Sequence, residues 1–436
     1  MNDVAFLVYY PFKQRQDNNS FDGNFNIGAN VIIDVLKRNN INVDFCTAET
    51  AHNYRIVLVS FTSDYDVYAF YTAVALLPNW QPKRKFIVVG GGEGMQNPTT
   101  IRNYLDYGVF GRAENIIVDL IDTVLGGSIF IHPSVMNLPE IHGVKVNQVK
   151  KLYPYEINLG GGRGKRDWKE SFMGCPNKCL FCHYTWSRKW IGGNTYYQGD
   201  LTMSRSVEVL WKDIINMEKK EGRVRSAIDG FSERLRFAYG KKITNDEIIE
   251  GINKVGSFGG ITVLMTYNIS NMPHETEQDR QELYATIKQA NPKNRVIIVF
   301  QSTPFRPSLL TPLQWAPVKL FPATSDLSAK VIYDSDNLRA MHSFSNESPY
   351  SQLQTIIVSR ATKETDKLFH TISFHPKLKS GTARNKIKLL QNTFDLSQYL
   401  REYNFEEKHP AWFLESYTNK EVLWKLYQKA ESRFIT

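Results

Sequence analysis

The stretch Gly174-Cys-Pro-Asn-Lys-Cys-Leu-Phe-Cys-His183 holds three of the four cysteines of a 436-residue chain. Cys175, Cys179 and Cys182 are separated by three and then two residues, and Cys46 lies far upstream. Three thiolates in one short loop can reach three corners of a compact cluster and leave the fourth open. Structural zinc usually takes four protein ligands, so a zinc site would need a further histidine. The spacing therefore favours an iron–sulfur cluster with one open iron, and structural zinc is the alternative.

The rest of the composition is that of a folded protein with two or more domains, with 42% hydrophobic residues over 436 positions. Four cysteines cannot form a disulfide scaffold in a chain of this length, which leaves thiols free to bind metal in a reducing compartment. No apolar run approaches the roughly 20 residues that cross a bilayer, and the N-terminus lacks signal-peptide features. We therefore expect a cytoplasmic protein without membrane partners.

The net charge of +9 is unevenly distributed. Residues 1–150 hold 12 of the 53 basic and 14 of the 44 acidic side chains, so the remainder carries 41 basic and 30 acidic ones. A basic surplus in one part of a chain fits an anionic partner, such as DNA, RNA or a phosphorylated substrate. Simple solubility is the alternative. Five basic residues lie close together beside His375, namely Lys377, Lys379, Arg384, Lys386 and Lys388.

Residues 1–125 alternate short apolar runs with helix-like stretches. Continuous apolar strands separated by helices predict a parallel sheet covered on both faces. We therefore predict a doubly wound, Rossmann-like domain, whose ligand would lie at the carboxyl ends of the strands. The expected strands lie at 4–10, 42–45, 55–60, 85–90 and 107–110, and the expected helices at 29–38, 65–77, 99–105 and 114–123.

The remaining chain divides into three parts. A connector at 126–169 contains a glycine-rich run, and β-then-α units over 170–330 predict a partial (β/α) barrel. Residues 331–436 form a basic, helical extension that partly completes the barrel. Strands are expected at 168–173, 224–228, 261–268, 296–300 and 353–358, and helices at 204–220, 245–254 and 275–289.

The cysteine loop, with Phe181 directly before its last cysteine, resembles the signature loop of the radical S-adenosylmethionine (SAM) superfamily. The resemblance implies that Cys175, Cys179 and Cys182 ligate a [4Fe-4S] cluster and that Phe181 contacts SAM. In that superfamily the open iron chelates SAM, and an electron splits it into methionine and a 5′-deoxyadenosyl radical. The resemblance also implies an electron donor such as flavodoxin or ferredoxin.

Two later segments resemble SAM-binding elements of the same superfamily, and a third strand end at 300–307 offers Gln301. A stretch around Gly230 resembles its Ser-Glu-Arg element, and a stretch around Pro273 resembles its Pro-Gly-Glu-Thr element, although His274 replaces the glycine. Ser232 and Glu233 also suit the cap of the following helix, and this alternative stays open. The resemblance implies SAM contacts from Asp229, Ser232, Glu233, Asn268 and Gln301.

The front domain resembles the cobalamin-binding-type domain that precedes many radical SAM barrels. Glycines at 90–92 follow a late strand and do not match the Gly-x-Gly-x-x-Gly dinucleotide fingerprint. The Asp-x-His-x-x-Gly motif of some cobalamin proteins is absent, and a retained scaffold with an empty cleft is the alternative. Together the two resemblances cover about 1–310. Cobalamin contacts are expected from Ser60, Thr62, Gly90, Gly91, Gly92, Gly111 and Glu114.

We therefore expect an enzyme that activates a C–H bond. Methylation follows if cobalamin binds, and rearrangement or isomerisation if it does not. Methylthiolation is disfavoured, because Cys46 alone cannot hold a second cluster. The expected substrate is anionic, such as a nucleobase in DNA or RNA, with a small phosphorylated metabolite or a peptide as alternatives. A nucleic-acid-binding protein stabilised by zinc is the rival from another class.

Overall fold

The computed structural model describes residues 3–9, 27–81, 83–158, 167–170, 173–175, 177–192, 197–199, 206–209, 211–217, 223–320, 330–344, 348–407 and 413–435. The chain forms two compact units. The first unit comprises Met1–Glu170, Gln354–Thr382 and Glu406–Asn419, and the second comprises Ser171–Leu353, Ala383–Phe405 and Lys420–Thr436. The 126–169 connector thus belongs to the first unit, whereas the C-terminal extension contributes to both.

The first unit contains a six-stranded sheet with the order β2-β1-β3-β4-β5-β6. All neighbouring strands are parallel except β6, which is an antiparallel edge. The order reverses between β1 and β3, which is the position where doubly wound sheets bind ligands. The strands are β1 (Val4–Leu7), β2 (Val43–Cys46), β3 (Ile56–Ser60), β4 (Ile87–Gly91), β5 (Tyr107–Val109) and β6 (Val135–Asn137).

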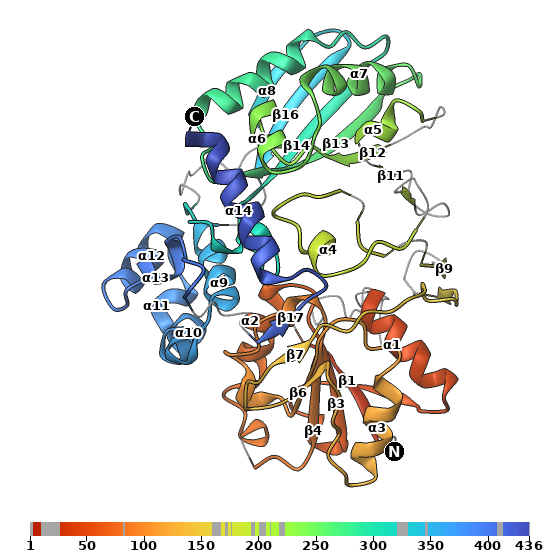
Figure 1. Cartoon of the computed structure of the whole chain (residues 1–436), viewed down its shortest axis with the longest axis vertical. Coiled ribbons are helices and arrows are strands. Elements are labelled where there is room, and N and C mark those ends of the chain that lie inside the picture. Colours follow the sequence, from red (N-terminus) through yellow and green to blue (C-terminus); the bar gives the residue numbers. More distant parts are fainter. Residues whose placement is uncertain are drawn as a thin grey trace. The chain divides into compact units, whose positions relative to one another are not determined.

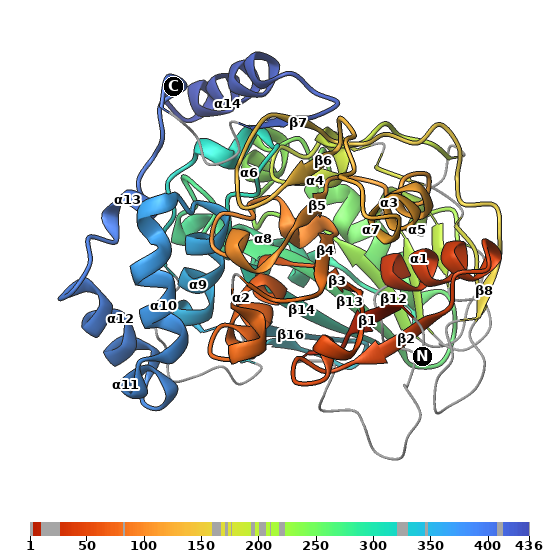
Figure 2. The same ribbon diagram turned by 90° about the horizontal axis from the view of Figure 1, so that it is seen from below.

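Helices lie on both faces of this sheet, as Figure 2 shows. Helices α1 (Ile27–Arg38) and α3 (Ile117–Leu125) share an apolar core with β1 and β3, whose side chains are almost fully buried. Helix α2 (Asp64–Val74) begins with a capping box between Ser63 and Asp66. Strands buried on both faces are expected of a doubly wound domain, and the prediction for this domain is confirmed.

Later segments of the chain complete the first unit. Strand β7 (Val144–Lys145) pairs with β17 (Leu414–Glu415), and β8 (Ile157–Asn158) pairs with β9 (Asp167–Trp168). Helix α10 (Asp366–Phe374) packs on α2, and it is followed by α11 (Pro376–Lys379). Contacts between residues about 260 or more positions apart therefore hold this unit together, including an ion pair between Arg102 and Asp366.

The second unit contains a seven-stranded sheet with the order β10-β11-β12-β13-β14-β16-β15. The five central strands are parallel and the two outer strands are antiparallel edges. The sheet is open, and the prediction of a partial barrel is confirmed. The strands are β10 (Tyr197–Gly199), β11 (Ser206–Val209), β12 (Arg223–Ala227), β13 (Thr262–Ser270), β14 (Val296–Pro304), β15 (Lys330–Asp334) and β16 (Leu338–Phe344).

One face of this sheet is covered by α7 (Asn245–Gly256) and α8 (Glu277–Gln289), as Figure 1 shows. Side chains along β13 and β14 alternate between buried and partly exposed. The buried set, which includes Leu264 and Ile298, packs against apolar residues of the two helices. The other set lies on the opposite face, which we call the open face.

The prediction of a helical C-terminal extension is confirmed. Helix α14 packs on the turn at Pro312–Trp315, where Trp424 and Tyr427 contact the ring of Trp315. The helices of the extension are α9 (Pro349–Ser359), α10, α11, α12 (Ala383–Gln391), α13 (Ser397–Leu400) and α14 (Lys420–Ile435). Among the described residues, no helix combines the length and the apolar character needed to span a membrane.

Three predicted elements are wrong. The expected helix at 99–105 contains only a short 3-10 turn, Arg102–Tyr104. In the described part of the expected helix at 204–220, strand β11 is followed by the short helix α5 (Trp211–Ile214), because Ser206–Val209 pairs in parallel with β12. Residues 204–205, 210 and 218–220 of that prediction lie outside the described residues. The expected strand at 353–358 is part of α9, whose residues from 352 onward are all buried. A helix buried on every side has no polar stripe, so its apolar run looks like a buried strand. The expected strand at 168–173 falls partly outside the described residues, and Met173 forms an isolated bridge with Ile191.

Candidate metal centre and cofactor site

The cysteine loop of the second unit is fixed at both of its ends. Before the loop, Met173 and Ile191 exchange two backbone hydrogen bonds of 2.8 and 3.0 Å. After the loop, helix α4 (His183–Trp186) begins directly behind Cys182. From α4, the indole Nε1 of Trp186 donates to the carbonyl of Cys179 at 2.8 Å. The loop is therefore held by backbone and side-chain contacts that leave the thiols available.

A second segment, at 239–241, supports the loop from behind. The amide of Leu180 donates to the carbonyl of Tyr239 at 2.9 Å. Gly240 has a φ of +83°, and a Cβ there would lie 2.4 Å from the carbonyl oxygen of Lys178. Only glycine permits this close approach of two backbones. The sequence Tyr239-Gly240-Lys241 thus docks directly against the cysteine loop.

The three thiols suit a cluster in their chemistry. Cys179 is buried, Cys175 and Cys182 are partly exposed, and none forms a disulfide. Burial raises the pKa of the Cys179 thiol to about 12 and that of the Cys182 thiol to about 11. Both therefore carry a proton at neutral pH in the protein without metal, and binding would displace it.

The arrangement of the described residues differs from that of a single-ion site. Among the described residues, no group of three or more His, Cys, Asp and Glu side chains is arranged to hold one metal ion. A four-iron cluster takes one thiolate on each ligated iron, so its ligands need not converge on one ion. Three thiols on a loop fixed by its own backbone fit that requirement.

A buried ion pair lies beside the loop. The ammonium group of Lys241 contacts Asp229 Oδ2 at 2.7 Å, and the two side chains are 8% and 14% exposed. Burial disfavours the charged form of Lys241, but the Asp229 carboxylate and the nearby Cys179 and Cys175 raise its pKa above its ordinary value. Lys241 therefore remains a cation next to the thiols. Asp229, which is a predicted SAM residue, is engaged by this cation.

Ser232 and Glu233 take part in contacts within the unit. Ser232 is the N-cap of α6 (Glu233–Ala238), and its hydroxyl accepts from the Leu235 amide and donates to Asp279 at 2.5 Å. Glu233 accepts from the amide of Asn245 at 2.7 Å. The capping alternative is confirmed for Ser232. Contact of either residue with SAM stays a prediction.

Asn268 and Gln301 lie on opposite faces of the sheet. Asn268 belongs to the buried set of β13, and its Oδ1 accepts from the Gly230 amide at 2.6 Å. Its Nδ2 is buried and has no hydrogen-bond partner in the described structure. Asn268 therefore braces the turn that follows Asp229. Gln301 lies on the open face in register with Tyr267 and Ser343. Phe181, within the loop, is partly exposed.

The open face carries a residue that sequence patterns did not identify. Arg225 of β12 is in register with Met265, Val299 and, through β14, Met341. Its Nε is buried, has no hydrogen-bond partner among the described residues, and sits in an otherwise apolar row. The alternation Arg223-Val-Arg-Ser-Ala227 predicts that Arg225 points away from Val224, but only strand pairing shows which face that is.

His274 adopts the geometry that glycine would provide in the motif it resembles. Its φ is +60°, in the left-handed region. The ring stacks on Phe434 of α14 with centroids 4.4 Å apart, and Nε2 lies 2.7 Å from Glu431. Contacts with the C-terminal helix thus offset the backbone strain of a non-glycine residue here.

Close packing in the first unit accounts for several glycines that were predicted to contact cobalamin. Gly92 has a φ of +110°, and a Cβ there would lie 2.3 Å from the carbonyl oxygen of Phe61. A Cβ on Gly111 would lie 2.4 Å from the Asn147 carbonyl oxygen, and one on Gly90 would lie 2.9 Å from Leu105. Gly91 has only ordinary contacts, the nearest at 3.5 Å.

The polar members of that predicted set are also engaged. The carbonyl of Ser60 accepts from the Tyr9 hydroxyl at 2.6 Å, and the Thr62 amide donates to Asp66 at 2.6 Å. Glu114 pairs with Arg112, which also pairs with Glu170. Each of these residues therefore has contacts within the unit, and its contact with cobalamin stays a prediction.

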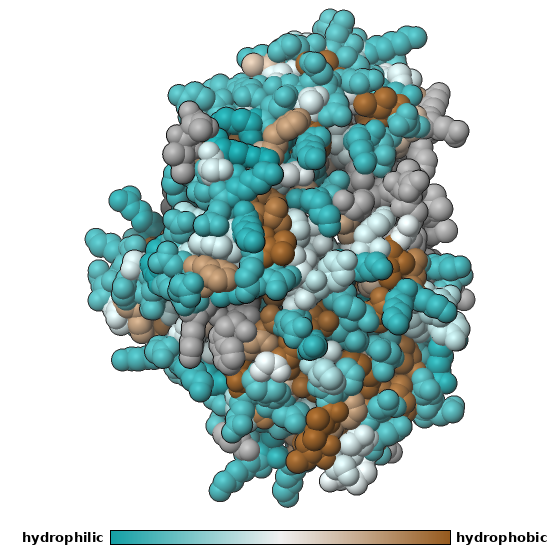
Figure 3. Space-filling view, in the orientation of Figure 1, coloured by the Kyte–Doolittle hydropathy of each residue, from teal (hydrophilic) through white to brown (hydrophobic). Residues whose placement is uncertain are grey.

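The basic residues of the extension do not form one patch within either unit. Lys377 and Lys379 belong to the first unit, whereas Arg384, Lys386 and Lys388 belong to the second. The side chains over α12 are hydrophilic in Figure 3. Lys386 lies 5.0 Å above the ring of Tyr350. Binding of nucleic acid at these residues stays a prediction.

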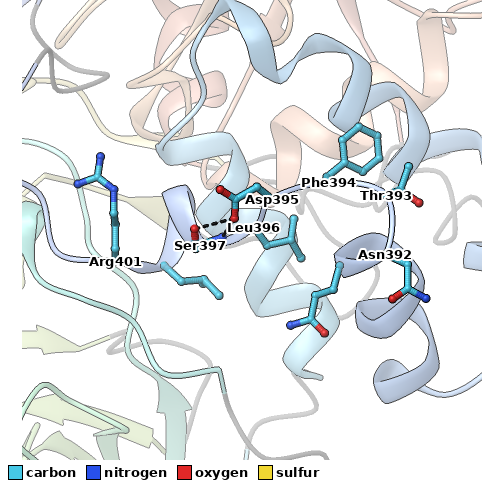
Figure 4. Close-up of a pocket in the computed structure, with 9 residues that line it drawn as sticks. Asn392, Thr393, Phe394, Asp395, Leu396, Ser397 and Arg401 are labelled. Carbon is cyan, nitrogen blue, oxygen red and sulfur yellow. Dashed lines mark hydrogen bonds between the residues drawn. The ribbon is translucent and has the colours of Figure 1, made fainter.

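A shallow hollow of about 850 Å³ lies between α12 and α13 (Figure 4). Residues 391–397, 400 and 401 line it. Within it the Ser397 hydroxyl donates to Asp395 at 2.6 Å. It contains none of the predicted site residues, and we assign no ligand to it.

Comparison with known proteins gives a limited likeness. No protein-family model matches the sequence, and no curated protein matches it. Solved structures similar to the chain include the cobalamin-dependent S-adenosylmethionine radical enzyme OxsB with aqua-cobalamin bound, at 12% identity and a TM-score of 0.42. They also include OxsB with aqua-cobalamin and S-adenosylmethionine bound, at 10% identity and a TM-score of 0.38. In both cases 66% of this chain is covered and the match spans about half, 52%, of that enzyme.

Proposed function

We propose that the chain is a radical SAM enzyme with a [4Fe-4S] cluster on Cys175, Cys179 and Cys182. The observation that carries the proposal is the structure of the cysteine loop. Hydrogen bonds fix both of its ends and also join it to the segment at 239–241, while its three thiols form no disulfides. When bound, the cluster would supply the electron that cleaves SAM to methionine and a 5′-deoxyadenosyl radical.

The protein's own part is to hold and orient these groups. The backbone at 239–241 fixes the loop, and Asn268 fixes the turn that presents Asp229. The open face of the sheet offers Tyr267, Gln301 and Ser343 in one row near the carboxyl ends of the strands. Parallel β/α sheets place their chemistry at these ends, so we assign the substrate to this face.

We further propose an anionic substrate, whose C–H bond is methylated or rearranged. A basic surplus beyond residue 150 supports an anionic group, and so does the buried Nε of Arg225, which has no hydrogen-bond partner in the described part of the chain. A nucleobase in DNA or RNA is the substrate class that we test first, and a small phosphorylated metabolite or a peptide comes next. A flavodoxin or ferredoxin would be the electron donor.

The test is anaerobic reconstitution with iron and sulfide, followed by incubation with SAM and dithionite. We expect brown protein that forms 5′-deoxyadenosine. The triple variant Cys175→Ala, Cys179→Ala, Cys182→Ala should lose both iron and product. Cys46→Ala is the matched control, because Cys46 is a buried cysteine of the first unit and should leave both unchanged. Colourless protein with one zinc per chain would overturn the proposal and support a zinc-stabilised nucleic-acid-binding protein.

Substrate and reaction type need a second experiment. The reconstituted enzyme is incubated with DNA, RNA or a metabolite extract, with and without methylcobalamin, and the products are analysed by mass. A gain of one methyl group that requires methylcobalamin would identify a cobalamin-dependent methylase. An isomer of unchanged mass would identify a rearrangement and favour the first unit as a scaffold.

A further inference from the structure

We propose that the buried Lys241–Asp229 pair sets the reduction potential of the cluster, with Lys241 favouring the reduced state and Asp229 opposing it. This inference rests on the proposed function, because it requires a cluster on the cysteine loop. Neither residue is proposed as an iron ligand. Both would act through charge on the groups that the loop holds.

The backbone segment that carries Lys241 packs against the cysteine loop. The backbone from Tyr239 to Lys241 runs along the cysteine loop, with a hydrogen bond from Leu180 to Tyr239 and direct packing of Gly240 on Lys178. Lys241 is the next residue, and its charge acts on Cys179 and Cys175. Asp229 acts on Cys179 and Cys182. The two charges therefore face the same three-cysteine loop.

The contact with Asp229 holds the Lys241 ammonium group in one position. The Lys241 ammonium donates to Asp229 Oδ2 at 2.7 Å, and Asp229 belongs to a turn fixed by the Gly230–Asn268 hydrogen bond. Asp229 itself has a φ of +47°, so this turn holds a conformation that aspartate adopts infrequently. A lysine on a flexible stem is thus given one position next to the thiols, rather than free access to solvent.

Burial of the Lys241–Asp229 pair strengthens the electrostatic effect of each charge on a cluster held by the loop. Both side chains are at most 14% exposed, so solvent and salt screen their charges less than those of surface residues. Reduction moves one electron from the donor to the cluster, and the cluster becomes more negative by one charge. A fixed cation stabilises that product and raises the potential, whereas a fixed anion lowers it. Burial is what distinguishes Lys241 from its neighbour Lys242, which is exposed.

The experiment measures the midpoint potential of the reconstituted protein by spectroscopic titration with dithionite, without substrate. Lys241→Met should lower the potential, and Asp229→Asn should raise it. The double variant, which is neutral, should lie between the two. Lys242→Met is the matched control and should leave the potential unchanged, because Lys242 is the adjacent lysine and its side chain is exposed to solvent. Iron content is measured for each protein, so that loss of cluster is not mistaken for a shift.

The midpoint potentials of the two single variants, relative to that of the unmodified protein, decide the outcome. A purely structural role would weaken cluster retention in both variants without moving the potentials in opposite directions. Equal potentials, or shifts of the same sign in protein that retains its iron, would overturn this inference while leaving the radical SAM assignment intact. Failure of the unmodified protein to hold any iron–sulfur cluster would overturn both.

Discussion

At the scale of single residues, the site depends on backbone positions that only one residue type can occupy. Gly240 allows the segment behind the cysteine loop to touch it, and Gly92 and Gly111 allow similar approaches in the first unit. In each case the glycine serves contact between two backbones. A glycine near a strand end is therefore as much a mark of close packing as of a bound cofactor.

Replacing Gly240 tests this view of the cysteine loop. Gly240→Ala forces Cβ toward the Lys178 carbonyl, in addition to the cost of about 1–2 kcal/mol for a non-glycine residue in the left-handed region. We expect a lower melting temperature and reduced iron binding. Gly260→Ala is the control, since Gly260 has a φ of +63° but nothing within 4 Å of its Cβ position. Normal iron binding by Gly240→Ala would contradict the proposed support of the loop.

His342 gives the second unit a pH-dependent stability. Its Nε2 lies 2.7 Å from the Ser302 hydroxyl and its Nδ1 lies 2.8 Å from the Tyr284 hydroxyl. Burial, with a smaller contribution from Arg280, lowers the pKa of His342 to about 4 from an ordinary 6.5. The unfolded chain therefore binds a proton between these two values that the folded chain does not.

Proton linkage gives the direction of this pH dependence, because the free energy of unfolding rises with pH wherever the unfolded state binds more protons. The free energy of unfolding should fall as pH drops from about 6.5 to about 4, by up to about 3 kcal/mol at about 1.36 kcal/mol per pKa unit. Urea unfolding at several pH values measures this. In His342→Gln the slope near pH 6 should be smaller, and an unchanged slope would show that another group is responsible.

At the scale of elements, strand pairing decides which side chains share a face. Gln301 lies on the open face with Tyr267, whereas Asn268, one residue away from Tyr267, is buried beneath the helices. Successive residues of a strand point to opposite faces, so both could not serve one ligand on the same face. Arg225 reaches the open face by the same rule.

The proposed role of Arg225 can be tested by substitutions on β12, the strand that carries it. If it holds an anionic group of the substrate, Arg225→Gln should lower kcat/KM for the modified substrate by about tenfold to a hundredfold, from the loss of a charged hydrogen bond. SAM cleavage without substrate should not change. Arg223→Gln is the matched control, because Arg223 is two residues earlier on the same face of β12 and is exposed. Equal effects of the two substitutions would point to a general role of positive charge.

At the scale of the whole molecule, the chain forms two compact units, each built from segments distant in the sequence. The three cysteines that we propose as cluster ligands lie in the second unit, whereas Cys46 lies in the first. A group that binds only folded protein stabilises the unit that holds it. The location of the cysteines therefore predicts which unit responds to removal of the cluster.

Removing iron with a chelator should lower the melting transition of the second unit and leave that of the first nearly unchanged. Calorimetry of the reconstituted and stripped protein measures the two transitions. Hydrogen exchange then assigns them, since amides of β12 and α7 should lose protection with the cluster and those of β3 and α1 should not. A shift confined to the first unit would contradict the assignment of the cluster to the cysteine loop.

Sequence patterns sufficed where a local property sets the structure. The apolar runs that became β1, β3 and β4, the helix-like stretch that became α7 and the three-cysteine loop all follow from neighbouring residues. Patterns failed at Ser206–Val209, where pairing with β12 overrides a helix-like segment, and at α9, where complete burial removes the polar stripe.

The sequence by itself predicts the type of metal chemistry, because three thiols within eight residues favour soft metals whatever surrounds them. It also determined that the chain holds two α/β units, because the alternation of apolar runs with helix-like stretches is a local property. Only the tertiary structure decided that Lys241 and Asp229 meet beside the thiols, that Arg225 shares a face with Gln301, and that Gly90, Gly92 and Gly111 serve packing. These relations depend on strand register and on contacts between distant segments, which the local order of residues does not encode.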